Sequence, residues 1–219
     1  MSLLAEAREQ VRARAFEHAK HTLTLALTEA PGDLDALRLD AECDERLGAF
    51  RTAYATLLTV SEHVAPDARG CFKLGTLAMR VDHQQSSQAA LAQRWFERSI
   101  ALDPSHAQAH FHLGIVHCVQ GRHVESEPHF RRAAELDPNM AKAHHELAKA
   151  LFQADRLDEA SEQLARVLEL DPDHGAAKAD LADLNRVRAV VRERPRIVRF
   201  PHKIGQVSDV RRAILEHVA

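Results

Sequence analysis

The sequence predicts an all-α protein built from repeated helical hairpins. The dipeptide Asp-Pro recurs at Asp103-Pro104, Asp137-Pro138 and Asp171-Pro172, each copy 34 residues after the previous one. A fixed period near 34 residues is typical of a helical hairpin that stacks on its neighbours because it cannot bury its apolar face alone. Only 5% of the residues are aromatic and eight are glycine, which favours helix over sheet. In such an array, function is expected on a surface.

The residues between the Asp-Pro pairs match position by position. Ala107 to Met140 aligns with Ala141 to His174, and large and small apolar side chains recur at the same places. The same frame extends to the N-terminus. The predicted copies lie at about residues 1–33, 34–67, 68–106, 107–140 and 141–174.

Helix boundaries follow from short polar residues, prolines and glycines. The predicted N-caps, whose side chains can accept a hydrogen bond from a free backbone N–H, are Asp33, Asp67, Ser105, Asn139 and Asp173. Asp-Pro ends the second helix of a copy, because proline disfavours a helical conformation in the residue before it and has no N–H. Gly48 and Gly121 mark the turns inside two hairpins.

Two segments depart from the repeat. Asp82 to Ser86 are extra in the third copy. We expect them to lengthen a connection or to extend the helix ends on one edge of the array, the alternative being a binding role. Residues 175–193 are predicted to form a helix that caps the array, so that the array would span 1–193. A non-repeat tail at 194–219 follows. Basic residues between Arg186 and Lys203 are expected to be solvated, the alternative being contact with an acidic partner or a membrane.

This pattern resembles the tetratricopeptide repeat family, whose copies carry Leu-Gly in the first helix, Ala-x3-Phe in the second and a closing proline. Here these places are held by Leu113-Gly114, Ser126, Phe130 and Pro138, and by Leu74-Gly75, Ala92, Phe96 and Pro104. The resemblance implies a right-handed superhelical solenoid of helix-turn-helix repeats.

Acidic residues break the family pattern near the N-terminus. Glu6 and Asp40 replace the usual Leu, and Asp44 stands where an aromatic residue is common. We expect these acids to face solvent after a small shift of register. The alternative is a buried acidic pair facing Arg12 or Arg14, because a buried carboxylate without a partner costs several kcal/mol.

The resemblance also implies a binding site, because ligands of the family lie in a concave groove lined by the first helices. Carried over by repeat place, the predicted peptide-binding residues are Arg38, Arg46, Arg69, Phe72, Lys73, Arg80, Gln108, Phe111, His112, Lys142, His145, Lys149 and Phe152. Basic side chains outnumber acids on this face, with phenylalanines between them. The expected partner is a protein or peptide segment with acidic and apolar residues.

A specific clamp for a C-terminal carboxylate, which some family members possess, is not expected. Arg69 and Lys73 stand at two of its basic places, but Leu4 and Leu39 occupy other places where polar residues are required.

Composition and motifs argue against other classes of function. A net charge of −3 argues against nucleic-acid binding, and no apolar run approaches the roughly 18 residues of a membrane span. Polar residues interrupt the N-terminus where a signal peptide would be apolar, so a cytoplasmic location is expected. Three widely spaced cysteines, Cys43, Cys71 and Cys118, are expected to be reduced packing residues.

Histidines are abundant, with eight of the fifteen between His106 and His145. A metal-binding or pH-responsive site is one interpretation, because His106 and His110 are spaced to share a helical face. We expect instead that His110, His117 and His144 are core or rim residues, because the family packs large side chains at their places. No metal or other cofactor is predicted.

The expected function is therefore a noncatalytic scaffold or adaptor that binds a peptide segment of another protein. The sequence contains no Gly-rich phosphate loop and no credible set of nucleophile, base and orienting acid. The alternative is a targeting domain of a larger enzyme whose catalytic part lies in or beyond the tail. The sequence does not indicate the partner's identity or the oligomeric state.

Overall fold

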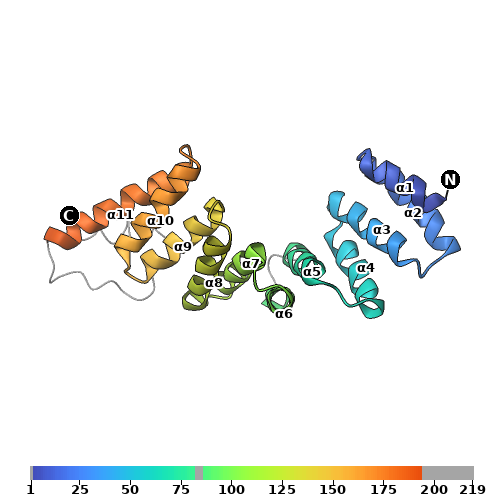
Figure 1. Ribbon diagram of the computed structural model, residues 1–219, viewed down its shortest axis with the longest axis horizontal. Coiled ribbons are helices and arrows are strands. Elements are labelled where there is room, and N and C mark those ends of the chain that lie inside the picture. Colours follow the sequence, from blue (N-terminus) through green and yellow to red (C-terminus); the bar gives the residue numbers. More distant parts are fainter. Residues whose placement is uncertain (1, 82–85, 194–219) are drawn as a thin grey trace. The chain divides into compact units, whose positions relative to one another are not determined.

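A computed structural model describes residues 2–81 and 86–193, and these form eleven α-helices with no β-strand among them (Figure 1). The helices are α1 (Leu3–Arg12), α2 (Phe16–Glu29), α3 (Leu34–Arg46), α4 (Phe50–His63), α5 (Ala68–Val81), α6 (Ser86–Leu102), α7 (Ala107–Val119), α8 (His123–Leu136), α9 (Ala141–Gln153), α10 (Leu157–Leu170) and α11 (Gly175–Glu193). The predicted all-α fold is confirmed. Positions 82–85 of the predicted insertion and the tail at 194–219 lie outside the described residues.

The chain divides into two compact units, Met1–Gln120 and Gly121–Ala219. Unit 1 contains the hairpins α1–α2, α3–α4 and α5–α6, which pack in succession. Helix α2 contacts α3, α4 contacts α5, and α6 contacts α7. In unit 2, α9 and α10 form a hairpin, with α8 against α9 and α11 against α10. By repeat place, α1, α3, α5, α7 and α9 are first helices, and the even-numbered helices are second helices.

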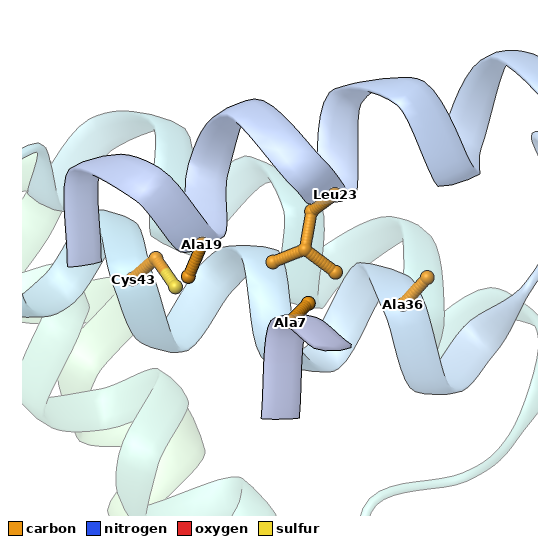
Figure 2. Close-up of a cluster of buried hydrophobic side chains, with 5 residues drawn as sticks. All are labelled: Ala7, Ala19, Leu23, Ala36 and Cys43. Atoms are coloured by element: carbon orange, nitrogen blue, oxygen red, sulfur yellow. The ribbon is translucent and has the colours of Figure 1, made fainter. Parts of the chain in front are cut away.

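Small residues allow the helices of unit 1 to approach closely. Figure 2 shows Leu23 of α2 reaching toward Ala7 of α1, within a buried cluster completed by Ala19, Ala36 and Cys43. A second buried cluster joins α5, α6 and α7 and contains Ala78, Ala92, Phe96, Leu113 and Val116. Burial of these apolar side chains is the main stabilising term for stacked hairpins.

One buried pair of places shows how side-chain size is matched between the helices. A Cβ atom added at Gly75 of α5 would lie 2.6 Å from the ring of Phe96 on α6, so the phenylalanine requires a residue without a side chain there. The sequence follows the same rule in every copy. Glycine accompanies phenylalanine in Gly75/Phe96 and Gly114/Phe130, and alanine accompanies leucine in Ala7/Leu23, Ala41/Leu57 and Ala148/Leu164.

The predicted caps are correct at two helices. The Asp33 carboxylate accepts hydrogen bonds from the N–H groups of Asp35 and Ala36 at the start of α3. The Asp67 carboxylate accepts one from Gly70 at 2.8 Å at the start of α5.

The predicted caps Ser105, Asn139 and Asp173 are wrong, because the aspartate of Asp-Pro organises the turn instead. The Asp103 carboxylate accepts the N–H of Ser105 at 3.0 Å, and its carbonyl oxygen accepts the N–H of His106. The next helix therefore begins one residue later than predicted. The N-cap positions of α7 and α9 are His106 and Met140, neither with a side-chain capping bond. Ahead of α11, His174 Nδ1 accepts the N–H of Ala177 at 3.1 Å.

The four turns inside hairpins that the structure describes have a left-handed residue at the same repeat place. Gly48 and Gly121 hold φ angles of +82° and +73°, which confirms the turns predicted there. Arg14 and Asp155, in the first and last copies, adopt +59° and +60° although they carry side chains. Each ends a first helix, where a left-handed residue lets the following N–H groups bond to the last free carbonyls.

The expectation that the N-terminal acids face solvent is wrong for two of them. Asp40 and Asp44 have side chains only 13% and 6% exposed, and both form ion pairs with Lys20 of α2, at 3.0 and 2.8 Å. The alternative arginine partners are also wrong. Glu6 is exposed, as expected. Burial lowers the pKa of Lys20, but hydrogen bonds to Asp44 and Asp40 and their charges outweigh it, so the pKa is raised.

Candidate peptide-binding surfaces

The predicted binding residues fall in both units. The nine in unit 1 lie on three first helices: Arg38 and Arg46 on α3, Arg69, Phe72, Lys73 and Arg80 on α5, and Gln108, Phe111 and His112 on α7. We call these nine residues the first-helix surface. The remaining four, Lys142, His145, Lys149 and Phe152, lie on α9 in unit 2.

Two basic residues of the first-helix surface are already paired with acids. Lys73 Nζ lies 3.0 Å from Glu45 Oε2, an ion pair that joins α5 to α3. Arg38 lies 3.5 Å from Asp35, which also accepts from Arg8 at 2.8 Å. The basic excess on this surface is therefore smaller than the sequence indicated.

The remaining basic charge is concentrated in three exposed arginines. Arg46 and Arg69 have no ion pair with an acid within residues 2–81 and 86–193. Arg80 places its guanidinium carbon 3.9 Å from the centre of the Phe50 ring, a cation–π contact that leaves its charge unneutralised. These three arginines can meet the carboxylates of a partner.

Phe72 packs within the protein rather than standing alone as an anchor. Its ring centre lies 4.8 Å from that of His106, 5.4 Å from His112 and 5.8 Å from Phe96. His106 Nδ1 and Ser99 Oγ are 3.0 Å apart, and that hydroxyl donates to the carbonyl of Ala68. Because the hydroxyl donates to the carbonyl, it accepts from His106, which therefore carries its proton on Nδ1.

In unit 2 the predicted residues of α9 also have internal partners. His145 Nε2 lies 2.8 Å from Asp180 Oδ2 on α11, and Lys149 Nζ lies 2.8 Å from Glu146. Lys142 is exposed. Beside Phe152 is a hollow of about 10 Å³, lined also by Ala148, Lys149, Leu164, Asp180 and Leu184. A space of that size holds about one water molecule, so it cannot accept a side chain of a partner.

The three histidines expected in the core or at its rim are buried, with His110 and His144 each 9% and His117 6% exposed, which confirms that prediction. His110 Nε2 lies 3.3 Å from the carbonyl of Pro104, and His144 Nε2 lies 3.2 Å from that of Pro138, one repeat later. Among the residues that the structure describes, no three His, Cys, Asp or Glu side chains gather as a metal site.

The cysteines are free thiols, with Cys43 and Cys71 buried and Cys118 partly exposed. Burial, with the charge of Asp40 next in importance, raises the pKa of Cys43 to about 11. Burial also raises the pKa of Cys71. A thiol held in its protonated form is a poor nucleophile, which fits a packing role.

Sequence reasoning missed a larger depression on the second helices of unit 1. It measures about 360 Å³ and is lined by Tyr54, Leu58, Leu91, Arg94, Trp95 and Arg98, from α4 and α6. The family resemblance predicts ligand contacts only on first helices. The signal that could have found it is the position of the only tryptophan and the only tyrosine of the chain, Trp95 and Tyr54.

Two family models, both described as tetratricopeptide repeat, match residues 81–141 and 120–184. This chain is a tetratricopeptide repeat protein. A search of curated proteins found no significant match. None of the helices within the described residues is long and apolar enough to span a membrane.

Solved structures share the fold of this tetratricopeptide repeat protein. YrrB, described as a TPR protein with an unusual peptide-binding site, has a TM-score of 0.69 at 19% identity over 81% of this chain and 89% of YrrB. MamA from Desulfovibrio magneticus RS-1 has a TM-score of 0.69 at 20% identity over 79% and 95%. A thermophilic TPR protein from Thermus thermophilus has a TM-score of 0.57 at 21% identity over 84% and 97%. The tetratricopeptide fold in general supports a protein–protein interaction scaffold.

Proposed function

We propose that this tetratricopeptide repeat protein is a noncatalytic cytoplasmic adaptor that binds an acidic, partly apolar peptide segment on its first-helix surface. The observation that carries the proposal is the exposure of Arg46 and Arg69, without ion pairs in the described residues, on successive first helices. The Lys73–Glu45 ion pair bridges those two helices. A segment crossing α3 and α5 would meet both arginines.

The arginines and the aromatic residues would contribute differently to binding. Exposed charges speed encounter and select an acidic partner, and buried aromatic contacts slow dissociation. Arg80 adds charge toward the end of α5, and Phe111 is a half-buried ring on α7. On α9, Phe152 would contact a peptide at the surface, because the hollow beside it is too small to take up a side chain.

A phage-displayed library of random twelve-residue peptides, selected on the wild-type protein, tests the proposal. Selected peptides should combine Asp or Glu with apolar residues and bind with a Kd on the order of micromolar, about −8 kcal/mol, that weakens as salt rises. Peptide binding is measured by fluorescence anisotropy and stopped-flow kinetics. Arg46→Glu with Arg69→Glu should slow association and weaken binding at least tenfold, whereas Phe111→Ala should mainly speed dissociation.

The matched control is Arg94→Glu with Arg98→Glu, which makes the same change in net charge on exposed arginines of the same unit. It should change by less than about twofold the binding of those peptides that lose affinity in the Arg46 and Arg69 variant. The proposal fails if no selected peptide is sensitive to the Arg46 and Arg69 changes, or if sensitive peptides lack acidic residues.

A further inference from the structure

The depression between α4 and α6 has the properties of a second docking site. We call its six lining residues, Tyr54, Leu58, Leu91, Arg94, Trp95 and Arg98, the Trp95 surface. Its volume of about 360 Å³ falls in the range of roughly 300–1,000 Å³ that is usual for ligand pockets. In contrast to the hollow beside Phe152, it can admit a large side chain.

The two aromatic residues of this surface are not required by the repeat. The residues at the place of Trp95 in the other copies are Thr22, Thr56, His129 and Gln163. Those at the place of Tyr54 are Lys20, Gln93, Glu127 and Ser161. Three copies therefore have polar residues at both places, and the second and third copies each have one aromatic and one polar residue there. Packing of the hairpins alone does not explain the aromatic pair.

The aromatic pair is held in place and still offers a donor. Trp95 Nε1–H donates to the Tyr54 hydroxyl at 3.1 Å, so the polar edge of the indole is satisfied. The Tyr54 hydroxyl proton has no acceptor among the described residues, and it can donate to a carbonyl or carboxylate of a partner. Leu91, 36% exposed, extends the apolar floor toward solvent.

The rim of the surface is basic. Arg94 and Arg98 are exposed, and neither forms an ion pair with an acid in the part of the chain that the structure describes. Arg98 lies with its guanidinium carbon 6.0 Å from the centre of the Trp95 ring. Arginines beside aromatic rings are characteristic of interface residues that contribute most to binding. Their charge favours an acidic occupant and disfavours the chain's own segment around Arg194 and Arg196, which is basic in sequence.

We propose that the Trp95 surface binds an acidic segment of another protein, separately from the first-helix surface. An aliphatic or aromatic side chain of that segment enters the depression over Trp95. Its flanking carboxylates pair with Arg94 and Arg98, and the Tyr54 hydroxyl donates to a carboxylate or backbone carbonyl. The inference shares no residue with the first-helix surface, so either proposal can fail alone.

The experiment uses Trp95 as its own reporter, because the chain has a single tryptophan. The random twelve-residue phage library is selected on the wild-type chain and counter-selected on Arg94→Glu with Arg98→Glu. Retained peptides, synthesised without tryptophan, should be acidic with a central apolar residue and should shift the emission of Trp95 saturably. The paired arginine change should weaken their binding at least tenfold, and Arg46→Glu with Arg69→Glu should change it less than about twofold.

Circular dichroism and thermal unfolding establish that the variants are folded. If the charge-reversed variant does not fold, Arg94→Gln with Arg98→Gln replaces it. We expect the affinity of that variant for the peptides to be intermediate. Three results would overturn the proposal: no peptide survives counter-selection, the surviving peptides leave Trp95 emission unchanged, or a single-stranded oligouridylate shifts that emission where acidic peptides do not. Self-association in sedimentation that is abolished by the Arg94 and Arg98 changes would also overturn it, because a second copy would then be the occupant.

Discussion

At the scale of the residue, side-chain size and charge at single buried places control how the hairpins close. Gly75 is the clearest case, because the ring of Phe96 occupies the space that a Cβ would need. Lys20 is the second, because its ammonium group is the partner of two acids on the next helix. In each case, a substitution should have an effect on stability that is set by the buried neighbours of that residue.

Gly75→Ala should destabilise the protein by about 1–3 kcal/mol, measured by urea unfolding. Glycine to alanine in a helix normally stabilises by about 1 kcal/mol, but here the added methyl group overpacks the contact with Phe96. Phe96→Leu should reduce the cost of Gly75→Ala in the double variant. At Gly32 an added methyl group has no neighbour within 4 Å, so Gly32→Ala should change stability little. An unchanged free energy of unfolding in Gly75→Ala would contradict the matching of side-chain sizes between these helices.

Lys20→Met should cost about 1–3 kcal/mol in the free energy of unfolding, because it leaves Asp40 and Asp44 without their cation. Lys178→Met is the matched control, since its partner Asp173 is fully exposed, and it should cost below about 1 kcal/mol. Equal effects of the two substitutions, measured by chemical denaturation, would show that the buried acids do not depend on Lys20.

The same pair predicts a dependence on pH. The pKa of Lys20 is raised above its ordinary value of 10.5, so its stabilising contribution is complete below that pH and is lost as the pH rises through the folded-state pKa. The difference in stability between wild type and Lys20→Met should therefore be constant in the neutral range and shrink at alkaline pH. A difference that grows above pH 10.5 would contradict this sign.

At the scale of the element, the turns that follow α1, α3, α7 and α9 share a left-handed backbone residue, but the identity of that residue differs. Gly48 adopts the left-handed region without strain, whereas Arg14 adopts it at a steric cost. The same backbone hydrogen bond closes both turns. The N–H of Ala15 donates to the carbonyl oxygen of Gln10 at 2.8 Å, and the N–H of Ala49 donates to that of Asp44 at 2.8 Å. The first hairpin therefore retains strain that the second lacks.

Arg14→Gly should stabilise the protein by about 0.5–1 kcal/mol, and Gly48→Ala should destabilise it by about 1 kcal/mol. The reason in both cases is the left-handed backbone at that place. Thermal unfolding of the two variants beside wild type measures the effect. Shifts of the same sign in both variants would contradict the account of the turn.

Sequence analysis was successful for elements that depend on local pattern and less so for pairs across helices. Asp-Pro spacing located the hairpins, but the capping residues after Asp-Pro were misplaced because the aspartate side chain bonds inside the turn. The burial of Asp40 was missed because its cation, Lys20, lies twenty residues away on another helix. The Glu45–Lys73 pair was missed for the same reason.

At the scale of the whole molecule, packing between the repeats provides stability, and we propose that the exposed surfaces provide binding. The candidate residues were placed on first helices correctly, but their internal partners could not be predicted from repeat places. Lys73 pairs with Glu45, and Phe72 packs against His106. The basic residues of this surface that remain available to a partner are Arg46, Arg69 and Arg80. Trp95 was not predicted as a binding residue because it lies on the second helix α6, whereas the family resemblance implies a groove lined by first helices.

The first-helix surface is tested most directly by an NMR map of the isotope-labelled chain bound to an acidic peptide that was selected on the wild type and still binds Arg94→Glu with Arg98→Glu. We expect the largest amide chemical-shift changes at saturation on α3 and α5, around Arg46, Arg69 and Arg80, and we expect Arg46→Glu with Arg69→Glu to abolish them. The claim would be contradicted if α3 and α5 are unmoved while the changes lie on α4 and α6 or in residues 194–219.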